Sequence, residues 1–181
     1  QVCMPRALSF ELAATLPILS STVALAFAEE MPIRASQRLL VHATTGGVGL
    51  VALEFAHRVG ARVAGTIGRP SKARYLRAAR IEAVASSRDS ACFAYGSATC
   101  LKCGRFDRVL SALTQGFIPA SLSLLADGSR YLEVGKNNIW SPARMGAAVA
   151  GERFRLVATD YQSSLWLHAR LQELSVRVDT G

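Results

Sequence analysis

A glycine-rich turn constrains the fold more than any other feature of this 181-residue sequence. It lies within the apolar stretch LLVHATTGGVGLVALEFA, residues 39–56. Residues 38–43 are short and apolar, as expected of a buried parallel strand. Residues 48–60 carry apolar side chains at helical spacing and stop at Gly60, a residue that commonly follows a helix. The sequence therefore predicts a strand, a tight turn and a helix in that order.

The same alternation continues along the chain. Residues 9–30 are expected to be helical with a break or kink at Pro17, whereas residues 92–107 show no amphipathic helix. Further strands are predicted at 61–67, 82–87, 107–113, 130–135 and 154–160, with helices at 71–80, 117–125 and 163–174. Such alternation predicts an α/β fold, a Rossmann-like doubly wound parallel sheet of six strands with helices on both faces.

The chain reads as one unit, because no repeat or low-complexity linker divides it. We expect a leading helical segment at 1–30, a Rossmann domain at 31–160, and a C-terminal helix with a truncated return segment at 161–181. The sequence opens on Gln1 and reaches its last residue with no evident end to the fold. We therefore expect it to be part of a longer protein.

Composition narrows the classes of partner. The formal net charge of +8 suits anionic partners, but the arginines are scattered, which disfavours nucleic-acid binding. The apolar run at 12–30 is interrupted by Pro17 and by hydroxyl residues, which favours a buried helix over a membrane span or a signal peptide. Cys100 and Cys103 form a CxxC pair without further ligands at suitable spacing, so we expect no metal site and reduced cysteines in an intracellular protein.

The glycines of the turn predict a dinucleotide site. Gly46 permits a tight turn, Gly47 allows the backbone to approach phosphates, and Gly49 allows the helix to pack closely on its strand. The alternative is a purely structural turn, but the position between a strand and a helix favours the ligand. The cofactor contacts predicted in this loop are Thr44, Thr45, Gly46, Gly47, Val48 and Gly49.

The end of the second predicted strand indicates which dinucleotide is bound. A protein that uses NAD usually carries an acidic residue there for the ribose hydroxyls, but the sequence reads TIGRPSKAR. Its basic and hydroxyl side chains suit a 2′-phosphate, which favours NADPH over NADH, although they could also merely cap a surface helix. The remaining predicted cofactor contacts are Thr66, Gly68, Arg69, Ser71, Lys72, Arg74, Ser111 and Gly135.

Several stretches together resemble a known family. They are AATLPILSSTVAL, LLVHATTGGVG, SKARYL, SSRD and ASLSLLADGSRYLEVGK, and with Asp160 the resemblance covers about residues 12–160. The sequence thereby resembles the medium-chain dehydrogenase/reductase superfamily, and within it the enoylreductase domains of polyketide synthases and animal-type fatty acid synthases. The resemblance implies that NADPH hydride adds to the β-carbon of an α,β-unsaturated acyl thioester on a carrier protein, without a metal.

The resemblance also implies catalytic residues and partners. Lys136 and Asp160 match residues proposed to orient the thioester or to deliver the proton; the alternative is a surface lysine and a strand-end aspartate. A separate GroES-like substrate domain, which this sequence does not encode, would cover the site. The family further implies a homodimer through the sheet edge, and we expect a cytoplasmic or organellar protein.

Two other functions stay open. Ser111 stands where the family usually has an asparagine near the nicotinamide, which fits a catalytically inactive scaffold or interaction subunit derived from a reductase. A zinc-free quinone reductase is the other alternative, although SRYLEVGK is closer to the synthase domains.

Overall fold

A computed structural model describes residues 2–6, 8–100, 105–148 and 153–180, with the side chains of 97–100 excepted. The six strands form a single parallel sheet in the order β3-β2-β1-β4-β5-β6. Their bounds are Arg38–Val41 (β1), Arg62–Ile67 (β2), Ala83–Ser86 (β3), Phe106–Ser111 (β4), Leu125–Glu133 (β5) and Phe154–Leu156 (β6). This order confirms the predicted doubly wound sheet and places the switch point between β1 and β4, where such sheets bind ligands.

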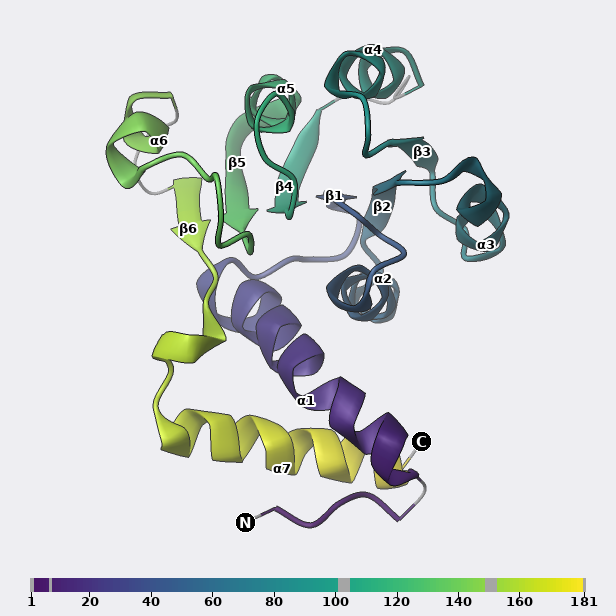
Figure 1. Ribbon diagram of the computed structural model, residues 1–181, viewed down its shortest axis with the longest axis vertical. Helices are drawn as coiled ribbons and strands as arrows, with labels where there is room; N and C mark the ends of the chain where they lie inside the picture. Colours follow the sequence, from purple (N-terminus) through teal and green to yellow (C-terminus); the bar gives the residue numbers. More distant parts are fainter. Residues whose placement is uncertain (1, 7, 101–104, 149–152, 181) are drawn as a thin grey trace.

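Helices cover both faces of the sheet (Figure 1). On one face, a hydrophobic core joins the strands to α1 (Phe10–Ala24), a π-helical turn (Leu25–Glu30), α2 (Gly47–Val59) and α3 (Ala73–Ala78). On the other face, a second core joins them to α4 (Ser90–Cys100), α5 (Phe117–Ser123) and α6 (Pro142–Ala148). The two cores make this part of the chain a three-layer α/β/α sandwich.

Helix α4 begins at Ser90 and ends at Cys100, within a stretch whose sequence shows no amphipathic pattern. The Asp89 carboxylate caps the helix, because its Oδ1 accepts hydrogen bonds of 2.9 Å from the amides of Ala91 and Cys92. Phe93 is fully buried and its ring lies 5.5 Å from that of Phe117. A cap and one large apolar anchor therefore position this helix, which explains why its sequence lacks an amphipathic stripe.

Helix α1 is continuous through Pro17, where the sequence predicts a break or kink. Together with the π-helical turn it forms a segment, Phe10–Glu30, that is long and apolar enough to cross a membrane by length and composition. Val23, Leu25 and Phe27 of this segment are at most 3% exposed and belong to the first core. The C-terminal part of the segment is therefore a core helix, whereas Phe10, Leu12 and Ile18 in its first half are exposed.

The boundaries of β5 and β6 differ from the predictions in ways that affect the site. Strand β5 begins already at Leu125, which the sequence predicts to end the preceding helix. Strand β6 ends at Leu156, and Asp160 lies in a 3-10 turn, Thr159–Tyr161, after it. Short helical turns of this kind carry no apolar period that a sequence could reveal.

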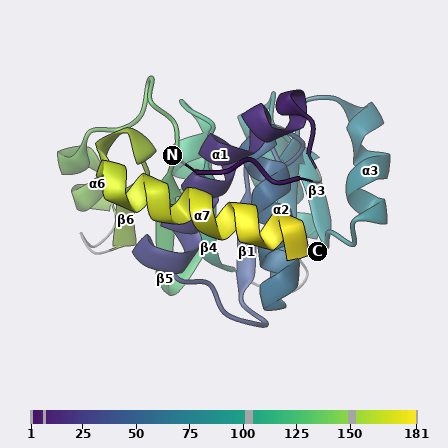
Figure 2. The same cartoon turned by 90° about the horizontal axis from the view of Figure 1, so that it is seen from below.

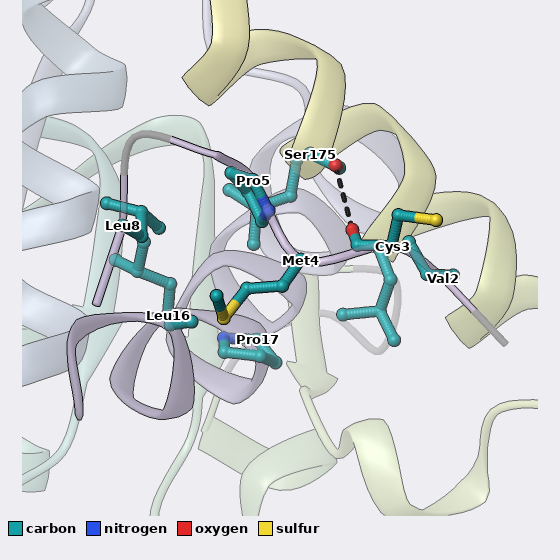
Figure 3. A pocket seen from close by; sticks show the side chains of 11 residues that line it. Val2, Cys3, Met4, Pro5, Leu8, Leu16, Pro17 and Ser175 are labelled. Carbon is teal, nitrogen blue, oxygen red and sulfur yellow. Dashed lines mark hydrogen bonds between the residues drawn. The ribbon is translucent and has the colours of Figure 1, made fainter. Parts of the chain in front are cut away.

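The N-terminal segment and the C-terminal helix lie together on the side of α1 away from the sheet (Figure 1). Helix α7 (Ser164–Thr180) crosses α1 there, as Figure 2 shows. The N-terminal segment follows α7, since the Arg6 amide donates to Asp179 Oδ1 at 3.0 Å and Ser175 Oγ donates to the Cys3 carbonyl at 3.0 Å. An apolar groove between this segment, α1 and α7 is lined by Val2, Met4, Pro5, Leu8, Leu16 and Leu171 (Figure 3). It lies among helices, away from the ends of the strands.

Candidate functional site

Two buried threonines join the ends of β1 and β2. Thr44 Oγ1 donates to the Val41 carbonyl at 2.8 Å and accepts from the Thr66 amide at 3.0 Å. Thr66 Oγ1 in turn accepts from the Ala43 amide at 2.9 Å. Both side chains are fully buried, so the two hydroxyls predicted to bind the cofactor are occupied in shaping the loop.

The glycines after Thr44 and Thr45 form the exposed start of α2. Gly46 and Gly47 are exposed, and no side chain caps the helix. A Cβ on Gly49 would lie 2.6 Å from the Thr44 Cα, so only glycine permits this approach of helix and loop. A Cβ on Gly47 would meet the Leu19 side chain of α1 at 2.8 Å.

This helix start can hold an anion. The amides of the first turn of a helix, here Gly47, Val48 and Gly49, have no carbonyl partner within the helix. A pyrophosphate would satisfy them and would gain from the positive end of the helix dipole. The residues present at the loop therefore fit the phosphates of a dinucleotide.

A basic surface follows β2. Arg69, Ser71, Lys72 and Arg74 are all exposed, in the 3-10 turn Pro70–Lys72 and the start of α3. Gly68 is half-buried, and between it and β3 lies a groove lined by Ile67, Gly68, Pro70, Ala73, Arg77, Val84, Ala85 and Ser86. No carboxylate lines this groove, which agrees with the basic character predicted from the sequence.

Arg88 joins this surface from the loop after β3. A Cβ on Gly68 would stand 3.2 Å from Arg88 Nε, so the guanidinium lies directly over the Gly68 backbone. Sequence reasoning missed Arg88 because its place depends on the pairing of Ile67 in β2 with Ser86 in β3. That register brings the residues after both strands together.

A buried polar network occupies the ends of β4 and β5. Tyr131 Oη donates to Ser111 Oγ at 2.7 Å and lies 3.3 Å from Glu133 Oε2. All three residues are at most 1% exposed. Burial raises the pKa of the Glu133 carboxyl to about 7 and raises the pKa of the Tyr131 phenol above its ordinary value. The Ser111 hydroxyl, predicted to lie beside the cofactor, is therefore occupied by a tyrosine.

The turn after β5 closes around the Glu133 carboxylate. Glu133 Oε1 accepts a 2.7 Å hydrogen bond from the amide of Gly135. A Cβ on Gly135 would lie 2.7 Å from the same oxygen, so a larger residue would force the Glu133 carboxylate to shift. Sequence reasoning missed Glu133, although an acidic residue inside the apolar strand RYLEVG is a recognisable signal.

Lys136 and Asp160 form an ion pair at the same edge of the sheet. Lys136 follows β5, Asp160 follows β6, and the ammonium Nζ contacts Asp160 Oδ2. Their side chains are 66% and 58% exposed. The pair therefore contributes little to stability and leaves a charged amine accessible beside the sheet.

His42 lies at the end of β1 and is sealed from solvent. Its Nε2 lies 3.0 Å from Ser121 Oγ, and its ring packs between Phe93 and Phe117. Burial lowers the pKa of this imidazole to about 3. His42 is therefore neutral near physiological pH and packs the second core.

The described part of the chain contains no group of three His, Cys, Asp or Glu side chains that could hold a metal ion. Cys3 and Cys92 are free and exposed. Cys103 and the side chain of Cys100, which form the CxxC pair of the sequence, lie outside the described residues.

The chain matches no protein-family model, but individual polyketide synthases resemble it over nearly its whole length. A highly reducing polyketide synthase of Emericella nidulans is 32% identical over 186 aligned residues, which cover 98% of this chain and 7% of that protein. Polyketide synthase GfsB of Streptomyces halstedii is 33% identical, with 98% of this chain and 3% of that protein covered. The chain thus spans less than a tenth of the length of these relatives.

Solved structures narrow the similarity to one domain. The CurK enoyl reductase aligns with a TM-score of 0.88 and 28% identity, over 99% of this chain and 55% of its own. The nucleotide-binding subdomain of the enoylreductase domain of PpsC from Mycobacterium tuberculosis aligns with a TM-score of 0.76 and 29% identity, over 90% and 91% of the two chains. Over its whole length the chain thus corresponds in sequence and fold to the nucleotide-binding half of the enoylreductase domains of polyketide synthases, in agreement with the resemblance to the medium-chain dehydrogenase/reductase superfamily.

Proposed function

We propose that this chain binds NADPH and serves as the nucleotide-binding half of an enoylreductase that reduces an α,β-unsaturated acyl thioester on a carrier protein. The observation that carries the proposal is the exposed, uncapped glycine start of α2 at the switch point of the sheet. Its loop is shaped by Thr44 and Thr66, and the Lys136–Asp160 pair lies at the same carboxyl edge. One edge thus offers an anion site and an accessible amine.

The basic surface after β2 supports NADPH over NADH. Arg69, Lys72 and Arg74 are exposed there, and Arg88 lies over Gly68. A 2′-phosphate carries two negative charges that guanidinium and ammonium groups bind well. The apolar walls of the groove between β2 and β3 suit an adenine ring.

The Lys136–Asp160 pair supports a role in the protonation half of the reaction. NADPH, when bound, supplies the hydride that adds to the β-carbon. The Lys136 ammonium then stabilises the enolate oxygen or donates the proton to the α-carbon. Asp160 holds this ammonium in place through the ion pair.

The partners follow from the same proposal. Both residues of the pair are more than half exposed, so a GroES-like substrate domain must exclude water and hold the acyl chain. We propose that this domain, neighbouring synthase domains and a second copy joined through the sheet edge complete the enzyme, in the cytoplasm or an organelle.

The test is a titration of the 181-residue chain with NADPH and with NADH, followed by nicotinamide fluorescence. We expect NADPH to bind more tightly, and Lys72→Ala to weaken NADPH binding by about tenfold while NADH binding stays nearly unchanged. Arg58→Ala is the matched control, because Arg58 is an exposed cation on α2 that pairs with Glu54. An equal loss for both cofactors in Lys72→Ala would remove the assignment of the 2′-phosphate.

An inactive scaffold is the second candidate. The buried Ser111 hydroxyl is bonded to Tyr131, so the position where the family carries an amide offers no free donor to the cofactor. If the chain is an inactive scaffold, nicotinamide fluorescence should not change at millimolar cofactor. That result would favour the scaffold over the enoylreductase.

A further inference from the structure

We propose that Glu133 is a positioning residue: its buried carboxylate holds the turn that presents Lys136, and its backbone holds the segment that presents Asp160. This inference rests on the role proposed above for the Lys136–Asp160 pair. Its tests include readouts on the chain alone that do not depend on cofactor or substrate.

The side chain of Glu133 reaches the Lys136 segment. Its Oε1 accepts from the amide of Gly135, the residue directly before Lys136, at 2.7 Å. The Val134 amide, one residue earlier, donates to the Ser111 carbonyl at 2.9 Å. Two consecutive amides before Lys136 are therefore bound, one to β4 and one to the carboxylate.

The backbone of Glu133 reaches the Asp160 segment. Its carbonyl accepts from the amide of Val157 at 2.8 Å, three residues before Asp160. Val157 is 3% exposed and belongs to the first core. Glu133 is thus hydrogen-bonded to both segments that carry the ion pair, and these bonds set the distance between the two segments.

The surroundings of the carboxylate are neutral. Tyr131 Oη, from the same strand as Glu133, and the Gly135 amide both lie against the carboxylate. On the neighbouring strands, Glu133 is paired with Ser111 of β4 and with Leu156 of β6. Among the described residues, hydrogen bonds without an ion pair compensate the buried carboxyl, and an apolar residue would be cheaper to bury. We infer that the Glu133 carboxyl is present because it shapes the turn before Lys136.

The acceptor strength of this carboxyl changes near neutral pH. Burial raises the pKa of Glu133 to about 7, and a carboxylate accepts an amide hydrogen bond more strongly than a carboxylic acid does. Raising the pH through 7 should therefore tighten the turn before Lys136. This gives the proposal a signature that simple packing would not produce.

The first experiment follows the Gly135 amide of the 181-residue chain by NMR between pH 5.5 and 8.5 (a range of about three pH units around the titration). We expect its proton to move downfield as the pH rises, with a midpoint near the pKa of about 7. In Glu133→Gln the titration should vanish, and in Glu133→Ala amide exchange should be about tenfold faster. Glu54→Gln is the matched control, because Glu54 is exposed on α2.

A Gly135 amide that neither titrates nor loses protection in Glu133→Ala would overturn the proposal. If Glu133→Ala fails to fold, Tyr131→Phe keeps the test open, because it removes the hydroxyl on Oε2 and leaves the bond from Gly135. Loss of that hydroxyl makes burial of the charge costlier, so the Gly135 titration should move to higher pH. An unchanged midpoint would count against the network.

The second experiment measures enoyl thioester reduction by the full-length polypeptide that contains the chain. We expect Glu133→Ala to lower kcat by about tenfold with KM for NADPH unchanged, and Glu133→Gln to restore kcat to within about threefold, because its amide oxygen still accepts from Gly135. Equal loss in both variants would contradict positioning. Absence of cofactor binding in the wild type would instead refute the proposed function and leave the NMR result standing.

Discussion

The two halves of the carboxyl edge of the sheet are built from different chemistry. At β1 and β2, neutral threonine hydroxyls and glycines shape the loop, and the buried His42 has a pKa of about 3. At β5, the buried Glu133 has a pKa of about 7 beside an exposed ion pair. The first half is therefore insensitive to pH near neutrality but intolerant of added volume, whereas the second titrates in the physiological range.

Adding one methyl group should damage the first half most. In Gly49→Ala the new Cβ would meet the Thr44 backbone at 2.6 Å, and overpacking against backbone should cost about 3 kcal/mol of unfolding free energy. Urea denaturation measures this loss. Gly96→Ala in α4 is the control, since a Cβ there meets nothing within 4 Å and should stabilise by up to about 1 kcal/mol. Equal effects at both glycines would contradict the close packing.

The pH dependence of stability should separate the halves next. Glu133 has a folded pKa of about 7 against an ordinary 4.5, so the stability it contributes is lost as the pH rises through that interval. His42 has a folded pKa of about 3 against 6.5, so its contribution is lost as the pH falls. Between pH 4.5 and 6.5 the two slopes therefore oppose each other.

Single substitutions should expose each slope. Glu133→Gln should make the unfolding free energy rise by about 2.5 kcal/mol from pH 4.5 to 6.5 relative to the wild type, and His42→Gln should make it fall by a similar amount. Urea midpoints at several pH values measure both. Parallel profiles for the wild type and the two variants would show that these groups do not titrate as their burial requires.

The smallest effect on stability should come from the ion pair. Asp160→Asn removes a charge from a pair whose side chains are more than half exposed, so the unfolding free energy should change by less than about 1 kcal/mol. Enoyl reduction by the full-length polypeptide should nevertheless fall by about tenfold or more, if the carboxylate holds the Lys136 ammonium. If Asp160→Asn instead lowered the unfolding free energy and left enoyl reduction unchanged, the ion pair would serve stability and not activity.

The sheet could be predicted from the sequence because each strand contains a short apolar run, although β5 begins at Leu125, before its apolar run. The glycine loop was predictable for the same local reason, and Gly49 packs on the loop as its position indicates. Helix α4 was missed because one cap and one phenylalanine position it. Local patterns thus indicated the elements, but not every way of anchoring them.

The site could be predicted only in part. Lys136 and Asp160 were named from a family resemblance, and their contact depends on the adjacent placement of β5 and β6. The hydroxyls of Thr44 and Ser111 were expected near the cofactor, but partners from other strands occupy them. Register between distant segments decides such contacts, and a single sequence does not state it.

The contact between the N-terminal segment and α7 joins residues that lie 173 and 172 positions apart in the sequence. Arg6 is bonded to Asp179 and Cys3 to Ser175, and both segments lie on the side of α1 away from the sheet (Figure 1). Loss of α7 would therefore remove both partners of the N-terminal segment, whereas the bonds that shape the carboxyl edge of the sheet would stay in place.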